Sequence, residues 1–203
     1  NFMNFRPNPL LYGAHEEFLS SFKLVVTMRD KVDHALLTKA VNSAIKRYPY
    51  FSVFPQKCGD SIRLQFNEAP VPVFEDGRCV VLGTEECDGH LLCFGCEDRR
   101  ILLHASHFIA DGMGISPLLM SVLYLYISEK YGTEGLDSRR ILMPDDPVSD
   151  DEYAYPFPDR VIEAEALNIP DAPEEAYALD ADAFDGEGLY AYHLHIPQKA
   201  MMT

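Results

Sequence analysis

Residues 101–117, ILLHASHFIADGMGISP, hold the side chains of this chain best suited to acid–base chemistry. His104 and His107 carry imidazole, which gains and loses a proton near neutral pH. Asp111 follows His107 by four residues. A positioned imidazole can take the proton that an alcohol or amine loses as it attacks an acyl group. The residues alone leave two interpretations open: a catalytic base, or a turn histidine bonded to its neighbours.

The elements around this stretch would fix such a side chain on both sides. Residues 101–106 are apolar and predict a strand, and residues 113–131 predict a helix. Ser116 is the expected N-cap, Pro117 the first helical residue and Gly132 the stop. The helix is apolar nearly all round, so we expect it to be buried on more than one side. A strand-to-helix turn is a good place to present a catalytic side chain.

The rest of the chain predicts an α+β fold. Residues 18–28 predict a strand. Asp33 is the expected N-cap of a helix that Pro49 ends. Its buried stripe comprises Leu36, Leu37, Ala40, Val41, Ala44 and Ile45. Residues 50–106 predict a meander of antiparallel strands, and residues 189–196 a last strand, with a short helix around 160–167. The order predicts helices packed on a mostly antiparallel sheet.

The run His-Phe-Ile-Ala-Asp-Gly, residues 107–112, resembles a known signature. It matches the second His, the Asp and the Gly of the His-His-x-x-x-Asp-Gly motif of the chloramphenicol-acetyltransferase-like superfamily. That superfamily includes condensation domains of nonribosomal peptide synthetases, plant BAHD acyltransferases and alcohol acetyltransferases. The resemblance covers roughly residues 15–131. It implies a two-layer α/β sandwich, with this chain as the N-terminal of two lobes and the active site between them.

The resemblance also implies roles for individual residues. His107 would be the catalytic general base. Asp111 would be structural, pointing away from the substrate, usually toward an Arg, and Gly112 would allow a tight bend. Ser106 stands where the family commonly has the first His of its pair. Ser106 and His104, which we expect to share one strand face, are possible site-lining residues.

The implied reaction moves an acyl group from a thioester to a small alcohol or amine. The donor would be acyl-CoA or an acyl carrier thioester, acting as a co-substrate, and we expect no metal and no tightly bound cofactor. The rival function is a non-catalytic binding or scaffolding lobe of the same fold. A condensation-type domain fragment of a peptide synthetase is a further alternative.

Charge divides the chain into three predicted parts. Residues 1–133 form the lobe with the motif. Residues 134–188 carry 17 acidic and 3 basic side chains, and predict a solvated, proline-punctuated crossover, with an acidic docking surface as the alternative. Residues 189–203 would begin a C-terminal lobe of the same protein, so we interpret the chain as a fragment, with an exposed lobe face that favours some self-association.

Composition excludes several classes of partner. A net charge of −15 argues against nucleic acid, which needs clustered Lys and Arg. The sequence has no apolar run of roughly 18 residues and no signal-peptide pattern, so we predict no membrane span and a cytoplasmic protein.

Metal-binding interpretations are weaker than the acyltransferase one. The chain has five cysteines, which we expect to be reduced, although Cys93 and Cys96 form a C-x-x-C that could bind zinc. His104, His107 and Asp111 are the residue types of non-haem iron sites, but at an unfamiliar spacing. His193 and His195 would share one face of the last strand.

Overall fold

The computed structural model describes residues 20–58, 61–78 and 80–152, all of which belong to the first of two compact units, Asn1–Pro158. The predicted helix at 160–167 and the predicted strand at 189–196, with its two histidines, lie outside the described residues. The division into 1–133, 134–188 and 189–203 remains a prediction.

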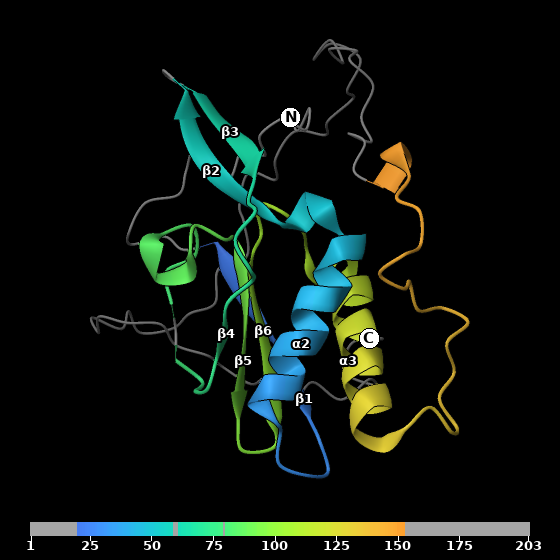
Figure 1. Ribbon diagram of the computed structural model, residues 1–203. Coiled ribbons are helices and arrows are strands. Elements are labelled where there is room, and N and C mark those ends of the chain that lie inside the picture. The colour runs from blue at the N-terminus through green and yellow to red at the C-terminus, as the bar shows by residue number, and fades with distance from the viewer. Residues whose placement is uncertain (1–19, 59–60, 79, 153–203) are drawn as a thin grey trace, which may run out of the picture. The chain divides into compact units, whose positions relative to one another are not determined.

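A four-stranded sheet forms one layer of the described unit (Figure 1). Its order is β1 (Ser21–Thr27), β6 (Arg100–Ser106), β5 (Leu92–Glu97) and β4 (Val73–Phe74). The pairs β1–β6 and β6–β5 are antiparallel, but β4 runs parallel to β5. The expected antiparallel meander is therefore wrong at β4.

A separate hairpin, β2 (Val53–Cys58) with β3 (Ser61–Phe66), interrupts the expected meander a second time. The chain that leaves β3 carries Pro70 and Pro72, which have no amide hydrogen to donate to a sheet ladder. It therefore leaves the hairpin as an extended connection and reaches the edge of the main sheet as β4.

Two helices form the second layer. Helix α2 (His34–Ala44) begins as predicted, because the Asp33 carboxylate accepts a hydrogen bond from the amide of Leu36 at 3.0 Å. Two 3₁₀ turns, η1 (Ile45–Arg47) and η2 (Pro49–Phe51), follow it. The second helix, α3, spans Gly112–Tyr131 and ends at Gly132 with a φ of 86°, which confirms the predicted stop.

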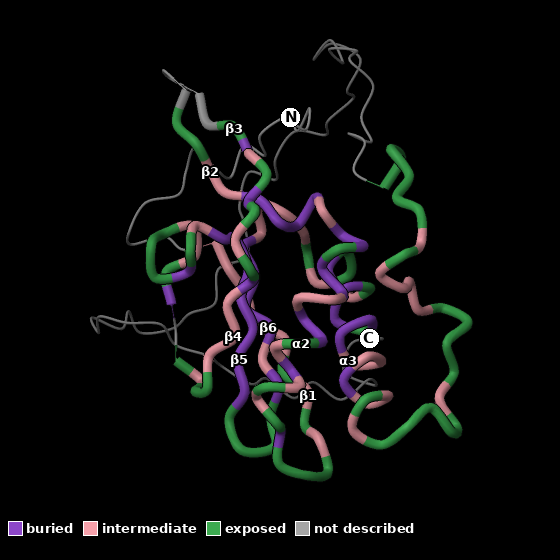
Figure 2. Tube along the Cα trace, in the orientation of Figure 1, coloured by how far each residue is buried: buried purple, intermediate pink, exposed green. Residues whose placement is uncertain are grey.

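Both helices pack on the same face of the sheet, which confirms the predicted two-layer α+β class. Figure 2 shows buried chain along β5, β6 and parts of α2 and α3. The shared core comprises Leu92, Phe94, Cys96, Ile101, Leu103 and Ala105 of the sheet and Leu37, Val41, Ala44, Ile115, Leu118 and Val122 of the helices. The prediction that α3 is buried on more than one side is wrong for its first half, because Met113 and Met120 are 83% and 50% exposed.

The first part of the acidic crossover is tied to the helices. The Leu142 carbonyl accepts a hydrogen bond from Ser121 of α3 at 2.8 Å. Glu152, in the turn η4 (Asp150–Glu152), accepts hydrogen bonds of 2.8 and 2.7 Å from the buried guanidinium of Arg47. The Tyr50 hydroxyl donates a third at 3.0 Å. Residues 134–152 are therefore not simply the solvated connection that composition predicted.

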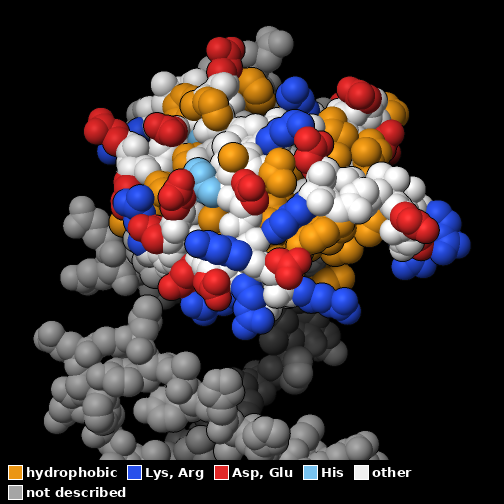
Figure 3. All heavy atoms as spheres, turned by 60° about the horizontal axis from the view of Figure 1, so that its bottom comes forward, with side chains coloured by type: hydrophobic (Ala, Val, Ile, Leu, Met, Phe, Trp, Pro, Cys, Tyr) orange, Lys and Arg blue, Asp and Glu red, His pale blue; other side chains and the backbone are white. Residues whose placement is uncertain are grey.

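On the face shown in Figure 3, basic and acidic side chains are interspersed. Exposed ion pairs such as Arg139 with Asp137 contribute little to stability, because water competes with each partner. Within the described ranges, no helix combines the length and the apolar character that a bilayer span requires.

Candidate functional site

His107 follows the last residue of β6 and lies on the helix side of the sheet. Its amide donates to the Ser20 carbonyl at 2.9 Å, which extends the β1–β6 ladder by one bond. Its imidazole contacts the Phe22 ring, with 4.5 Å between centroids and a 41° tilt. The backbone hydrogen bond and the ring contact restrain the residue. Part of it still reaches solvent, because His107 is only partly buried.

Ser106 holds the turn in place through hydrogen bonds of its hydroxyl and its carbonyl. It is only 3% exposed, and its hydroxyl accepts a hydrogen bond from the Phe108 amide at 3.3 Å and donates to the Ser20 carbonyl at 3.4 Å. The Ser106 carbonyl in turn accepts from the Ile109 amide at 3.2 Å. The hydroxyl that stands in place of the first histidine of the motif therefore helps to shape the turn that carries His107.

Asp111 is the N-cap of α3, whereas the sequence predicts Ser116 at that position. Its carboxylate accepts from the Gly114 amide at 2.7 Å, so the helix begins at Gly112. The predicted cap at Ser116 and first residue at Pro117 are wrong: both lie inside the helix, and the Ser116 hydroxyl donates to the Gly112 carbonyl at 2.6 Å. An N-cap aspartate is also favoured by the positive end of the helix dipole.

The expectation attached to Gly112 needs correction. Among the described residues no arginine forms an ion pair with Asp111, so its implied arginine partner stays a prediction. Gly112 is the first helical residue rather than a tight bend, and a methyl group placed on it would meet no atom within 4 Å. The turn is held by the cap and by Ser106, not by glycine's backbone freedom.

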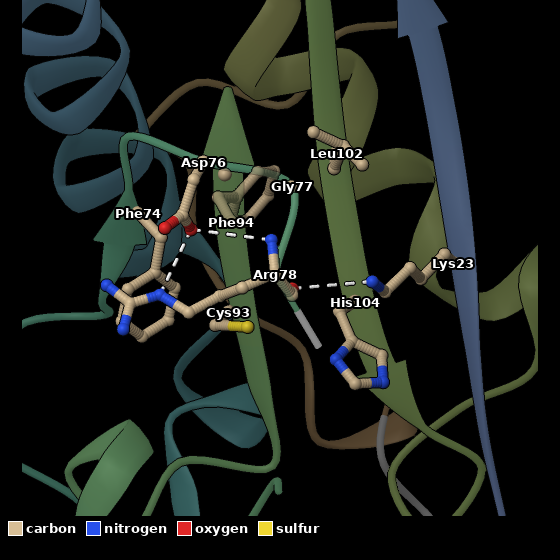
Figure 4. Close-up of a pocket in the computed structure, with 10 residues that line it drawn as sticks. Lys23, Phe74, Asp76, Gly77, Arg78, Cys93, Phe94, Leu102 and His104 are labelled. Atoms are coloured by element: carbon tan, nitrogen blue, oxygen red, sulfur yellow. Dashed lines mark hydrogen bonds and ion pairs between the residues drawn. The ribbon is translucent and has the colours of Figure 1, made fainter. Parts of the chain in front are cut away.

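His104 lies on the opposite face of the sheet, away from the helices. Its Nε2 is 3.0 Å from the Ser21 hydroxyl, and its Nδ1 has no partner among the described residues. Figure 4 shows it with Lys23, Cys93 and Arg78 around a cavity of about 10 Å³, the space of one water molecule. Burial first, and the Lys23 ammonium second, lower the pKa of His104 to about 4.

The structure therefore brings His107, Ser106 and Asp111 together in one turn and leaves His104 outside it. Strand alternation separates the two imidazoles, because Ala105 and His107 follow the helix face while His104 follows the other. A shared iron site at His104, His107 and Asp111 is excluded by this separation. No cluster of three or more His, Cys, Asp or Glu in the described ranges could hold a metal ion.

The same alternation excludes zinc binding by the C-x-x-C pair. Cys96 is buried in the core beneath the helices, whereas Cys93 packs on the other face with Val80 and Cys87. Two thiols on opposite faces of a strand cannot bind one ion. Cys87, Cys93 and Cys96 are buried and form no disulfide. Hydrogen bonding with Cys87 and then burial raise the pKa of the Cys93 thiol, and burial raises the pKa of Cys96.

Sequence reasoning missed the residues of β1 that hold His107. Phe22 and Ser20 are more than 80 residues away in the chain, and only the register of β1 on β6 brings them to the turn. The alternation within residues 18–28 could have placed Phe22 on the core face. It could not have shown which residue of the other strand Phe22 meets.

Solved structures similar to this chain include condensation domains and related proteins. The starter condensation domain of rhizomide synthetase RzmA matches at a TM-score of 0.44 and 14% identity, covering 59% of this chain and 34% of that one. Polyketide synthase associated protein 5 from Mycobacterium tuberculosis matches at 0.44 and 17%, covering 64% and 31%. A variant of the RzmA domain in complex with C8-CoA matches at 0.44 and 13%, covering 55% and 31%.

This chain thus spans about a third of the length of each of these structures. Neither a family model nor a curated protein matches it. The likeness assigns no reaction to the chain.

Proposed function

We propose that this chain is one lobe of an acyltransferase in which His107 takes a proton from an alcohol or amine attacking a thioester. The observation that carries the proposal is a partly exposed histidine, His107, at the strand-to-helix turn. Its backbone is fixed by the Ser20 carbonyl on one side, and the turn ends at the Asp111 cap on the other. A general base needs this combination of fixed position and access.

The proposed acyl transfer needs no oxidant or reductant. The acceptor oxygen or nitrogen forms a bond to the thioester carbonyl carbon, and its proton passes to His107. The carbon–sulfur bond then breaks, and the thiolate leaves with the proton that His107 returns. The products are an ester or an amide and a free thiol. The thiol is that of CoA or of the acyl carrier, depending on the donor.

Thiol release by the full-length protein tests this role. Because the chain spans only part of its structural neighbours, the whole protein is needed, with a panel of acyl-CoA donors and of small alcohols and amines. We expect His107→Ala to lower kcat by roughly two to four powers of ten with little change in KM, the usual contribution of a general base. Added imidazole should restore part of the lost turnover.

A matched control is His34→Gln, which removes another partly exposed histidine. The His34 ring contacts the Val73 carbonyl at 2.8 Å and Glu75 at 3.2 Å, so it serves the α2–β4 contact instead of the turn. Turnover by His107→Ala equal to that of the unmodified protein would remove the base from the mechanism. Binding of acyl donors without any thiol release would favour the non-catalytic lobe.

A further inference from the structure

Strand β1 supports His107 at two points. The Ser20 carbonyl, just before the strand, holds the His107 amide at 2.9 Å, and the ring of Phe22 lies against the imidazole at 4.5 Å. The first contact fixes the backbone at the end of β6. The second fixes the side chain itself.

The position of Phe22 follows from the register of the sheet. Phe22 is paired with Ala105, and alternation places both on the helix face, which His107 rejoins two residues later. The Phe22 ring packs against the core that the sheet shares with α2 and α3. Because the core restricts the ring, it can serve as a fixed wall for the imidazole.

We infer that Phe22 is a positioning residue, which selects the side-chain rotamer of His107 in which the imidazole can take the proton. The inference rests on the function proposed above. A histidine side chain has about three staggered χ1 states and about two broad χ2 states. A ring that sampled all of these states equally would spend about one sixth of its time in the working orientation, so removing the Phe22 wall should lower kcat by up to about sixfold.

Three variants separate positioning from packing. Phe22→Leu keeps an apolar side chain but removes the flat wall, and Phe22→Tyr keeps the ring. Leu24→Ala is the matched packing control, because Leu24 lies on the same face of β1, packs on the same core and pairs with Leu103 instead of a residue near the turn. Thermal unfolding of all three shows how much each change costs in stability.

Two measurements on the full-length protein complete the test. NMR of the histidine ring protons reports the Phe22 ring current, with the His107 signals assigned by their loss in His107→Gln. We expect Phe22→Leu to shift the His107 signals and lower kcat by up to about sixfold at unchanged KM, and Phe22→Tyr to keep kcat within about twofold of the unmodified protein. Leu24→Ala should leave the His107 signals in place.

Unmoved His107 signals in Phe22→Leu would overturn the inference, as would an equal loss of kcat in Leu24→Ala. The NMR result does not depend on catalysis. If His107→Ala kept full turnover, the proposed reaction would fail while the ring contact would still be measured, so the two failures can be told apart.

Discussion

The buried ion pair between Arg47 and Glu152 should contribute strongly to stability. The Arg47 side chain is 4% exposed and the Glu152 side chain 25%. Hydrogen bonding to Arg47, the largest cause, holds the pKa of Glu152 at about 2, against 4.5 for an unperturbed glutamate. At about 1.4 kcal/mol per pKa unit this corresponds to roughly 3 kcal/mol, and to about 2 kcal/mol after allowing for solvent at the carboxylate.

We therefore expect Glu152→Gln to lower the free energy of unfolding at pH 7 by about 2 to 3 kcal/mol, because it leaves a buried guanidinium without its counter-charge. Urea unfolding followed by far-UV circular dichroism measures this, since the chain has no Trp. Lys39→Gln is the control: its pair with Glu129 on the surface of the helices has side chains 66% and 50% exposed and should contribute less than about 0.5 kcal/mol.

The pH dependence gives a second check. A carboxyl whose folded pKa is depressed stabilises the fold fully above its unfolded pKa. The contribution of Glu152 should therefore be complete above about pH 4.5 and decline as the pH falls toward about 2. Equal stability of Glu152→Gln and Lys39→Gln, or a difference that stays constant from pH 7 to pH 3, would refute the reasoning.

The remaining predictions concern the turn, the far face of the sheet and the thiols. Asp111→Ala should cost about 1 kcal/mol, measured by urea unfolding, while Asp111→Ser keeps the cap. Gly112→Ala should be neutral or slightly stabilising in the same assay, because the added methyl meets no atom within 4 Å. The folded pKa of His104 lies below its unfolded 6.5, so stability should fall by roughly 3 kcal/mol between pH 6.5 and 4, and His104→Leu should remove this slope. Cys93 and Cys96 should resist alkylation until urea unfolds the protein, as peptide mass mapping would show.

Features with a local cause could be predicted from the sequence. The Asp33 cap, the apolar stripe after it and the Gly132 stop all depend on residues within a turn or two of each other. The start of α3 was harder, because Asp111 and Ser116 are both good caps. The earlier start wins because it adds a helical turn that places Ile115 in the core at 0% exposure.

Features with a distant cause could not be predicted. The parallel pairing of β4 depends on where the chain returns after the β2–β3 hairpin. The contacts of Arg47 with Glu152 and of Phe22 with His107 join residues 105 and 85 positions apart. No pattern within either segment indicates its partner, since only the packed sheet and helices bring them together.

The alternation of side chains along β6 places His104 and His107 on different faces of the sheet. Ile101, Leu103 and Ala105 face the helices, whereas Leu102 and His104 line the cavity shown in Figure 4. His104 is thereby placed where burial and the Lys23 ammonium keep its ring neutral down to about pH 4. His107, three residues later, lies on the helix face just after the end of the strand, and its ring contacts Phe22. The two imidazoles of one short segment therefore have different physical environments: His104 is buried on the far face of the sheet, whereas His107 is partly exposed and lies against Phe22.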